Sequence, residues 1–563
     1  MDISEFEQKS IAHQSLLADL GVRTKQGSFY TPFDVAGNLA ITALNTALAR
    51  VRKPGDCPRV LDPTCGTGNF LIASALHISE RLVQLGMSQT ESFIYVVKNC
   101  LFGTDIDLSA VEICRSNLAR LIPESNCESE LSRHVLAVDS LRLFLKGGGR
   151  AGQGSLFDEP EMTWADIFAE VFAGDDPGFD AVIGNPPFLN QLETETALSA
   201  DLASALSERY GNSFSKLTNT ASIFMLGASE IVNSGGVVTM IQPISFLATR
   251  ESAEIRKSLL NRGSLTDLWF GGSKIFDAAV EVVGVTISAE QPDGKTRITV
   301  GREFNEIGFF DAPQEGEKTW SRPLARAKGV PHCAFSAGGI VGDYARATAD
   351  FRDQYYGLVG AVRDLQVSEG QGDLLRLATV GLIDLAKCMW GERSTKFARQ
   401  TYLRPVVDVQ VLSKELRNWA ISRAKPKVIV SNQTKLLEVY VDVGGDILPS
   451  VPLLTLDCEI ENLWLVAAAI SSPLATLVAA ERHLGAGMSG DVLKLSAKDV
   501  LNLPVPSDVK AWTRGAQIFK ELQEKGGSDG TKLLQSFADE MNTAFAVSDL
   551  DIGRWWIGRL PRR

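Results

Sequence analysis

The chain has 563 residues and a mass of 61.0 kDa, which is too long for one hydrophobic core and predicts about two to four domains. Hydrophobic residues make up 45% and charged residues 22%, a composition that excludes a disordered or fibrous protein. The formal net charge of -12 excludes a global positive field, so binding to nucleic acid would need a local basic surface.

The N-terminus and the cysteines favour a cytoplasmic protein. The first ten residues are acidic where a secretory signal would be basic and then apolar. Eight cysteines are scattered without a CxxC pair, and the five histidines do not cluster with them, so we expect neither a metal site nor a disulfide framework. The longest uncharged stretch, 462–480, is interrupted by Ser471, Ser472 and Pro473 and predicts two buried helices, with no membrane span.

The first 300 residues or so alternate strand-like apolar runs with amphipathic segments. This alternation predicts an α/β fold, a Rossmann-like doubly wound and mainly parallel sheet. The predicted strands are 59–65, 100–107, 134–141, 179–185, 237–243, 265–270 and 281–289. The predicted helices are 69–85, 109–122 and 220–236. A glycine-rich segment, 146–161, predicts a surface loop between the third and fourth strands.

The alternation fades after about residue 300. We predict a first domain over 1–310, a connection over 311–340 and a second domain of mixed α+β structure over 341–563, with a helical segment at its C-terminal end.

A glycine turn follows the first predicted strand. Gly66 and Gly68 would let the backbone approach a ligand closely, and the next helix would offer unpaired N–H groups. Leu71 stands where a dinucleotide fingerprint needs a third glycine, which disfavours a pyrophosphate ligand. Asp62, at the strand end, suits a cationic ligand.

Two further carboxylates end the next two strands. Asp105 could accept hydrogen bonds from two ribose hydroxyls, and Asp139 could accept from an adenine amine. Either one alone could instead be a helix cap or a loop residue. With the glycine turn, the three carboxylates predict a pocket for an adenosine that carries a positive centre.

Asn185 ends the fourth strand and is followed by Pro186 and Pro187. Proline cannot donate to a sheet ladder, so the strand stops there and leaves the amide at its carboxyl end, where open α/β sheets bind ligands. Asn-Pro is also typical of a plain turn.

Five short motifs occur in an order that resembles the N6-adenine DNA methyltransferases that use S-adenosylmethionine, in the class where the cofactor motif precedes the catalytic one. The motifs are GSFYTP (27–32), LDPTCGTGNF (61–70), GTDID (103–107), AVDS (137–140) and GNPPF (184–188). The resemblance covers roughly the first 300 residues and implies that 1–310 is an S-adenosylmethionine-dependent methyltransferase domain.

The resemblance implies the catalytic residues. In such enzymes the Asn amide oxygen and the next Pro carbonyl accept both hydrogens of the adenine N6 amine, which here means Asn185 and Pro186. Pro187 would stiffen the turn and Phe188 would stack on the base. Catalysis then rests on positioning and directed hydrogen bonds, and a duplex adenine has to flip out to reach the site. Phe276 resembles the aromatic residue that contacts the other face of the flipped base.

The resemblance also implies the cofactor-binding residues. They are Tyr30, Thr31, Pro32, Asp62, Thr64, Gly66, Gly68, Asn69, Phe70, Asp105, Ile106, Asp139 and Ser140. Thr31 and Pro32 are also typical of a helix start, with Thr31 as the cap and Pro32 in the first turn.

A basic stretch marks the second domain. Between residues 387 and 435, eleven Lys or Arg stand against three acidic residues, which predicts a surface that faces DNA phosphates, although a solvated helix face is an alternative. The candidate DNA-backbone residues are Arg393, Lys396, Arg399, Arg404, Lys414, Arg417, Arg423, Lys425 and Lys427. Residues 375–506 are similar, more loosely, to the closing part of target-recognition regions, so we predict a DNA target-recognition domain over 341–563.

These features predict a site-specific adenine methylase that marks host DNA in restriction or phage defence. Only 26 residues precede GSFYTP, so any nuclease is expected on a separate restriction or defence chain. The alternatives are methylation of an RNA adenine or a protein glutamine, or an idle nucleic-acid-binding protein.

Overall fold

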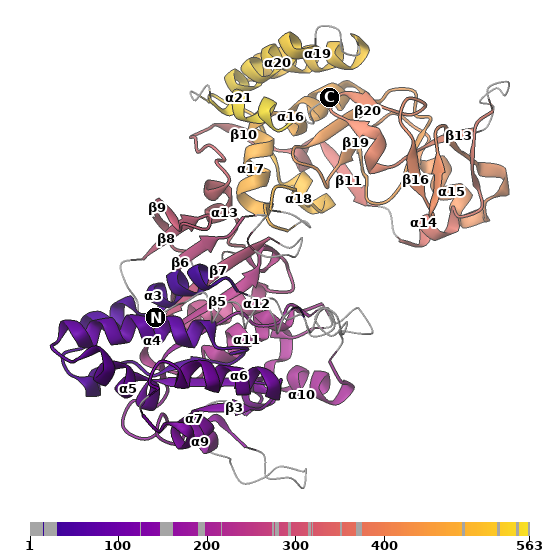
Figure 1. Cartoon of the computed structure of the whole chain (residues 1–563). Helices are drawn as coiled ribbons and strands as arrows, with labels where there is room; N and C mark the ends of the chain where they lie inside the picture. The colour runs from indigo at the N-terminus through magenta and orange to yellow at the C-terminus, as the bar shows by residue number, and fades with distance from the viewer. Residues whose placement is uncertain are drawn as a thin grey trace. The chain divides into compact units, whose positions relative to one another are not determined.

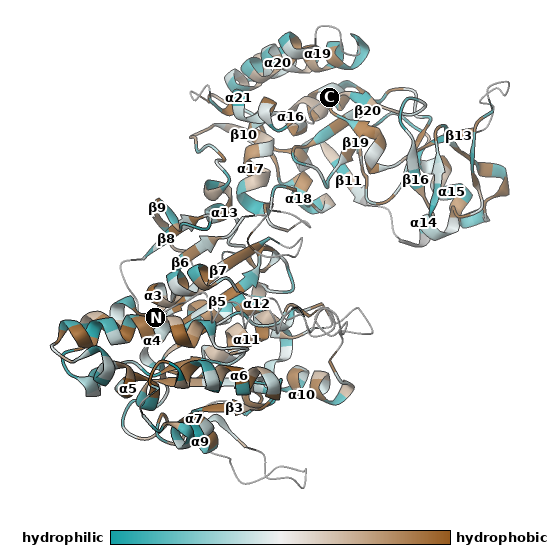
Figure 2. Ribbon diagram, in the orientation of Figure 1, coloured by the Kyte–Doolittle hydropathy of each residue, from teal (hydrophilic) through white to brown (hydrophobic). Residues whose placement is uncertain are grey.

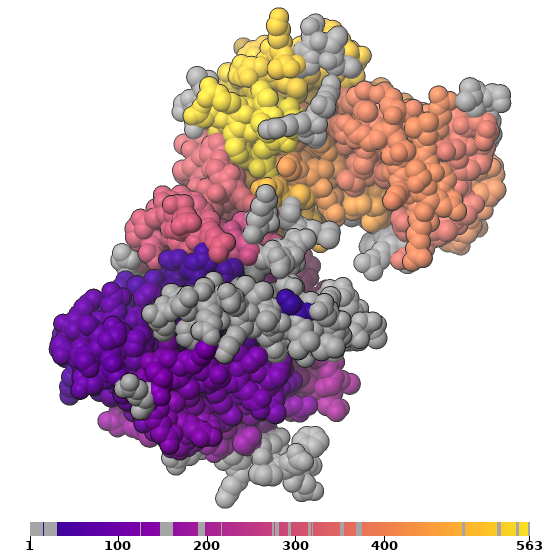
Figure 3. Space-filling model, viewed as in Figure 1, coloured from indigo at the N-terminus to yellow at the C-terminus, as the bar shows by residue number. Residues whose placement is uncertain are grey.

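The computed structural model of the chain forms two compact units, Met1–Pro323 and Leu324–Arg563, whose colours can be followed in Figures 1 and 3. It describes residues 15, 31–123, 125–146, 162–189, 198–215, 217–272, 275, 281–290, 294–313, 317, 319–349, 352–366, 374–486, 490–525, 530–547 and 551–560. The boundary falls within helix α13 (Ser321–Ala327), so the predicted connection over 311–340 is divided between the two units.

The first unit is built on one nine-stranded sheet with the order β3-β2-β1-β4-β5-β7-β6-β8-β9. The first five strands in this order, β3, β2, β1, β4 and β5, are all parallel. Strands β6 and β8 are parallel to each other, and β7 and β9 run antiparallel to their neighbours. The predicted mainly parallel, doubly wound sheet is confirmed. The strands are β1 Val60–Asp62, β2 Leu101–Asp105, β3 Val135–Ala137, β4 Phe179–Gly184, β5 Val232–Pro243, β6 Ser264–Phe270, β7 Val282–Ser288, β8 Lys295–Val300 and β9 Asn305–Asp311.

The helices of the first unit follow these strands in chain order (Figure 1). They are α3 Phe33–Arg50, α4 Asn69–Gln84, α5 Gln89–Asn99, α6 Leu108–Ala119, α7 Glu128–His134, α8 Ser140–Phe144, α9 Trp164–Ile167, α10 Ala200–Tyr210, α11 Thr220–Ala228 and α12 Ala253–Arg262.

Both faces of the sheet are covered. Adjacent residues on a strand point to opposite faces. On β2, Leu101 belongs to the core cluster that also contains α3 and α4 side chains, whereas Phe102 packs against Phe168 and Phe179 with ring centroids 5.2 and 5.5 Å apart. A sheet covered on both faces leaves its strand ends as the accessible edge where a ligand can bind.

The predicted helix over 220–236 is wrong in its second half. Helix α11 ends at Ala228, and β5 begins at Val232. At Gly236 a Cβ would lie 2.8 Å from the Phe179 carbonyl oxygen, so this glycine serves the close approach of β5 to β4 and not a helix end. Strands β8 and β9 were not predicted and continue the sheet past residue 300.

The second unit holds two four-stranded sheets, β11-β22-β19-β20 and β12-β18-β13-β21, and the two-stranded pairs β10-β23, β14-β15 and β16-β17. The strands are β10 Ala337–Ile340, β11 Ala345–Ala349, β12 Val362–Asp364, β13 Leu374–Ala378, β14 Ile383–Asp384, β15 Lys387–Cys388, β16 Thr395–Phe397, β17 Gln400–Tyr402, β18 Pro405–Asp408, β19 Lys427–Ser431, β20 Glu438–Asp442, β21 Ile447–Pro449, β22 Leu454–Cys458 and β23 Pro504–Pro506. Its helices are α14 Arg352–Gly357, α15 Lys414–Arg423, α16 Leu463–Ser471, α17 Pro473–His483, α18 Ala497–Leu501, α19 Val509–Lys525, α20 Gly530–Ala544 and α21 Asp551–Gly558.

The helices at the C-terminal end are amphipathic, and α19 buries Ala511, Trp512 and Phe519 along one face (Figure 2). The uncharged stretch 462–480 forms the two buried helices α16 and α17, as predicted. Across the described part of the chain, no single helix is long and apolar enough to cross a membrane. One pair bent by 56°, Ile460–Ser471 with Pro473–His483, reaches that length and apolarity only when its two helices are taken together.

Candidate active site

The candidate site lies where β1, β2 and β4 end side by side. The chain runs outward from β1 through β2 to β3 and then returns to place β4 on the other side of β1, so the order of the strands reverses between β1 and β4. In open α/β sheets this reversal is the usual ligand crevice. The predicted motifs around Asp62, Asp105 and Asn185 therefore meet at one edge of the sheet.

The glycine turn after β1 forms a cradle. Gly66 has a φ of +50° and open space where a Cβ would stand, so a ligand can lie against its backbone. Its N–H donates to Asp105 Oδ2 at 2.8 Å, which ties the turn to the end of β2. Gly68, with a φ of +97°, is the N-cap of α4, and a Cβ there would lie 2.7 Å from the Cys114 sulfur.

The two carboxylates beside the turn are buried and carry raised pKa values. Burial, with a smaller contribution from the nearby Asp105 charge, raises the pKa of Asp62 to about 8, although hydrogen bonds from Thr64 oppose the rise. Burial likewise raises the pKa of Asp105. No cation among the described residues forms an ion pair with either one, so a positively charged ligand would complement this pocket.

The strand end that carries Gly184 is packed directly against Asp62 and Thr64. A Cβ on Gly184 would lie 2.7 Å from Asp62 Oδ1 and 3.3 Å from Thr64 Oγ1, so only glycine fits between them. The next residue, Asn185, is half-buried and lies just past the end of β4.

A chain of amides and one hydroxyl orients Asn185. Asn185 Nδ2 donates to Thr31 Oγ1 at 3.0 Å, and Asn69 Nδ2 donates to the Thr31 carbonyl at 2.9 Å. The bond to Thr31 therefore fixes which end of the Asn185 amide is the nitrogen and which is the accepting oxygen. The interpretation of Thr31 as the cap of α3, with Pro32 in the first turn, is wrong. Pro32 occupies the N-cap position without a side-chain bond, and the helix begins at Phe33.

Thr220 braces the loop that follows. Its Oγ1 donates to the Pro187 carbonyl at 2.6 Å and accepts from the Leu189 N–H at 3.1 Å. Within the described part of the chain no group donates to the Pro186 carbonyl, so of the two proline carbonyls it is the Pro186 oxygen, in a buried residue, that has no hydrogen-bond donor there. Thr220 was missed from the sequence because a threonine at a helix start gives no signal for a loop 31 residues earlier.

The remaining predicted residues take varied places. Ser140 Oγ donates to the Pro63 carbonyl at 2.7 Å and pairs with Thr104 Oγ1 at 2.8 Å, which latches the ends of β1 and β2 to α8. The Asp139 carboxylate accepts from the Leu141 N–H and caps α8. Ile106 is 70% exposed beside Asp105.

Two predicted aromatic side chains pack inward. Phe70 is buried in the core, and Phe188 is partly buried against the same core cluster. Tyr30 and Phe276 lie outside the described residues. No group of three or more His, Cys, Asp or Glu in the described ranges could hold a metal ion.

The basic stretch of the second unit is less positive than its count suggests. Lys427 is fully buried and forms an ion pair with Asp442 at 2.5 Å, so its assignment as a DNA-backbone residue is wrong. Arg393 and Lys425 pair with acidic residues outside the stretch, Asp384 at 2.7 Å and Asp457 at 3.1 Å. Arg417 donates to the carbonyls of Val409, Gln410 and Leu412.

Five of the predicted cations are exposed. Arg393 and Lys425 are the two that form the ion pairs named above, whereas Lys396, Arg399 and Lys414 form no ion pair among the described residues. Arg404 and Arg423 are half-buried.

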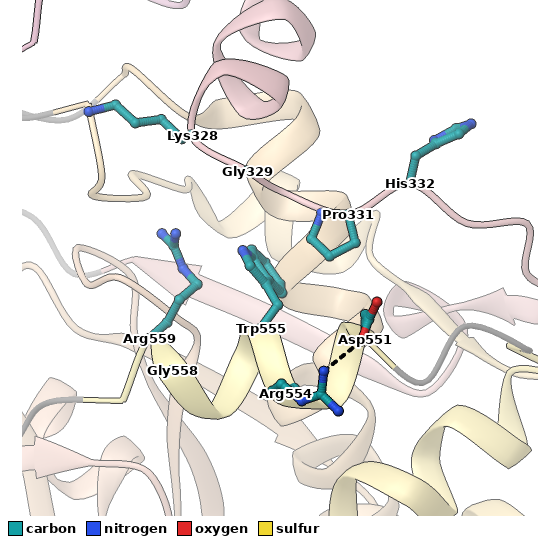
Figure 4. Close-up of a pocket in the computed structure, with 9 residues that line it drawn as sticks. All are labelled: Lys328, Gly329, Pro331, His332, Asp551, Arg554, Trp555, Gly558 and Arg559. Carbon is teal, nitrogen blue, oxygen red and sulfur yellow. Dashed lines mark hydrogen bonds and ion pairs between the residues drawn. The ribbon is translucent and has the colours of Figure 1, made fainter. Parts of the chain in front are cut away.

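The second unit also carries an open cleft of about 730 Å³ between residues 328–332 and α21 (Figure 4). Its cations are already engaged. Lys328 pairs with Asp491 at 3.5 Å, Arg554 pairs with Asp551 at 3.0 Å, and Arg559 donates to the carbonyls of Lys435 and Asp491.

Comparison with known proteins identifies the first unit. Residues 99–276 match the family model of the Eco57I restriction-modification methylase, and residues 29–142 match the RMKL-like methyltransferase domain. The Type II methyltransferase M.VspI of Vibrio sp. (strain 343) is 26% identical over 293 residues, which cover 51% of this chain and 54% of that protein. The adenine-specific methyltransferase PglX of Streptomyces coelicolor is 29% identical over 178 residues, 27% of this chain and 14% of that protein. The chain thus spans about half the length of the first relative and a small part of the second.

Two solved structures share the fold. The Type IIL restriction-modification enzyme MmeI in complex with DNA aligns over 92% of this chain and 74% of its own, with a TM-score of 0.52 and 13% identity. A nuclease-deletion mutant of the Type ISP restriction-modification enzyme LlaGI, in complex with a DNA substrate mimic, aligns over 88% and 54%, with a TM-score of 0.50 and 11% identity.

At these identities the likeness to MmeI and LlaGI is one of fold alone. The matching family models and the first relative agree with the restriction-modification methylase that the sequence motifs predicted. The chain is therefore similar to the Eco57I restriction-modification methylase over residues 99–276 and to a methyltransferase domain over residues 29–142.

Proposed function

We propose that this protein transfers a methyl group from S-adenosylmethionine to N6 of an adenine that is flipped out of double-stranded DNA. The observation that carries the proposal is the fixed orientation of the Asn185 amide, whose nitrogen donates to Thr31 while no described group donates to the neighbouring Pro186 carbonyl. An amine with two hydrogens is the group that two such acceptors would bind. One relative is named an adenine-specific methyltransferase, which supports adenine as the target.

The chain's own groups would act by position. Asn185 Oδ1 and the Pro186 oxygen would each accept one N6 hydrogen, which draws the nitrogen lone pair away from the adenine ring and fixes its direction. S-adenosylmethionine, when bound, supplies the electrophilic methyl group. Phe188 would stack on the base, and Thr220 would keep the loop that carries these groups in place.

The residues at the strand ends fit S-adenosylmethionine. The buried carboxylates of Asp62 and Asp105 suit its positive charge and its ribose hydroxyls, and the open space at Gly66 suits close approach of the ligand to the backbone. The exposed Ile106 would cover the adenine ring, and Asp139 and Ser140 would close the far side.

The second unit would bind the DNA. Its exposed cations Lys396, Arg399 and Lys414 are the candidates for phosphate contacts, and MmeI and LlaGI, which share the fold, were solved with DNA or a DNA mimic. The names of the relatives favour a role in a restriction-modification system.

The test is methyl transfer from labelled S-adenosylmethionine to unmethylated genomic DNA, followed by mapping of N6-methyladenine. Asn185→Ala should abolish transfer while cofactor binding, measured by calorimetry, stays within about twofold of wild type. Asn99→Ala is the matched control, because Asn99 is exposed on α5 and bonds only locally, to the Tyr95 carbonyl. Full transfer by Asn185→Ala would refute the role of Asn185. Label in RNA or in a protein glutamine, with none in DNA, would refute the substrate.

A further inference from the structure

The hairpin β16–β17 of the second unit has an unusual turn. Its strands pair Lys396 with Thr401 and Phe397 with Gln400, so only Ala398 and Arg399 form the turn. Both have positive φ, 47° and 67°, which is the backbone of a two-residue type I′ hairpin turn. Such turns strongly favour Asn-Gly or Gly-Gly, because side chains are disfavoured at positive φ. The chain therefore has Ala398 and Arg399 at two turn positions where glycine would be the least strained residue.

The inward face of the hairpin is packed against neighbouring segments of the second unit. Phe397 is 2% exposed and packs on Tyr355 with ring centroids 4.6 Å apart, and Thr395 Oγ1 lies 2.5 Å from Thr379 Oγ1. Tyr355 also accepts the Ala398 N–H at 3.0 Å, so the strained turn itself is braced. The inward residues fix the tip, which leaves the outward residues free to serve a ligand.

The outward face is cationic and polar. Lys396 and its cross-strand partner Thr401 lie on it, Arg399 lies at the tip, and all three are exposed. Neither Lys396 nor Arg399 forms an ion pair with a carboxylate in the described ranges, whereas Lys387 and Arg393 nearby pair with Glu392 and Asp384. Gln400 is opposite Phe397 and therefore lies on the other face, where its Oε1 accepts from the Tyr402 hydroxyl at 2.6 Å.

We propose that the hairpin β16–β17 is a groove-reading ribbon that enters the major groove of duplex DNA, with Arg399 on a base edge and Lys396 on a phosphate. This inference rests on the proposed function only in taking duplex DNA as the ligand. A two-stranded ribbon fits the major groove, and a guanidinium is the side chain that best pairs with the two acceptors of guanine. Backbone strain kept at a tip indicates that the direction of the tip side chain matters.

This differs from a phosphate role for Arg399. A phosphate contact would tolerate a turn of any direction and would affect all DNA sequences equally. A base contact requires a fixed tip and affects one position of the recognised site. The brace from Tyr355 is the feature that favours the base contact.

The main experiment selects binding sites from a random duplex pool with the full chain and needs no catalysis. The wild type should enrich one motif. Arg399→Ala should lose the preference at one position, with about ten- to hundredfold weaker binding to the wild-type motif and unchanged binding to unrelated DNA. Arg514→Ala is the matched control, because Arg514 is exposed on α19 and pairs with Glu540. An unchanged motif with Arg399→Ala, or a wild type that enriches no motif, would overturn the proposal.

Two further variants separate the roles within the hairpin. Lys396→Ala should weaken all sequences alike and lower the slope of log Kd against log salt by about one. Tyr355→Phe keeps the ring but removes the acceptor for the Ala398 N–H, so it should relax the motif without changing the slope. If Arg399→Ala instead weakens binding to all sequences alike and lowers the salt slope, Arg399 contacts a phosphate and the ribbon does not read bases. A protein that enriches a motif but methylates no DNA would refute the proposed function and leave this inference standing.

Discussion

Replacing Thr31 by Val tests whether this residue orients the catalytic amide. Thr31 is 6% exposed, and valine has the same shape, so the packing around it should be kept. The substitution removes the acceptor for Asn185 Nδ2, at 3.0 Å, but leaves the Thr31 carbonyl that Asn69 bonds. One such hydrogen bond contributes about 0.5–1.5 kcal/mol, so kcat should fall about two- to tenfold. A half-turn of the amide would place its NH₂ against the adenine amine and add to the loss.

The assay is single-turnover methyl transfer at saturating cofactor, with the cofactor Kd measured separately by calorimetry. If Thr31 orients Asn185, kcat falls and Kd stays near the wild-type value. If Thr31 instead holds the methionine end of the cofactor, as the motif resemblance implies, Kd rises and kcat recovers at saturation. Thr31→Ser should restore most of the rate. Thr42→Val on α3, where the hydroxyl donates to the Asn38 carbonyl and accepts from Arg297 at 3.5 Å, is the matched control. An unchanged kcat in Thr31→Val would refute the orienting role.

The raised pKa of Asp62, about 8, means that between its ordinary value of 3.8 and about 8 the folded state holds a proton that the unfolded state has lost. Without cofactor, the free energy of unfolding should therefore fall as the pH rises through this window, by at most about 1.4 kcal/mol per pH unit. Asp62→Asn should flatten this pH dependence in denaturant titrations. An unaltered slope would contradict the raised pKa of Asp62. A cationic cofactor should lower this pKa, so binding near pH 7 should release up to about one proton, measurable by calorimetry in buffers of different ionisation enthalpy. Thr220→Val leaves the Pro187 carbonyl and the Leu189 N–H without their partner and should cost about 1–3 kcal/mol of stability and lower kcat at unchanged cofactor Kd, whereas Thr220→Ser should recover both. Lys427→Ala breaks a buried ion pair and should destabilise the second unit by about 3–5 kcal/mol, while the salt slope of DNA binding stays as in wild type; a lower slope would return Lys427 to the DNA surface.

The sequence was informative where local chemistry decides the structure. The glycine turn, the acidic strand ends and the Asn-Pro-Pro stop could be placed because glycine, proline and a strand end each restrict the backbone within a few residues. The parallel half of the sheet followed from regular alternation of strands and helices. Strands β8 and β9 lie beyond that alternation, because β8 pairs with β6, earlier in the chain, and β9 pairs with β8.

Contacts between distant residues could not be predicted in the same way. The bond from Asn185 to Thr31 joins residues 154 positions apart, and the sequence presents Thr31 only as a cap or a cofactor contact. A count of charges between 387 and 435 includes Lys427 as a free positive charge. The count misses the residue that neutralises it, Asp442, which lies on the neighbouring strand β20 and outside the counted stretch. Charge patterns therefore locate a basic region but do not tell which of its members reach the surface.

The close fit at Gly184 links two parts of the protein that could otherwise change separately in evolution. Any side chain at 184 would push against the Asp62 carboxylate, 2.7 Å from where its first carbon would stand. A substitution at Gly184 would therefore disturb the proposed cofactor pocket as well as the proposed site of the target base. Attempts to alter the accepted base by redesign should therefore leave Gly184 unchanged and vary the loop from Phe188 onward, which is supported independently by Thr220.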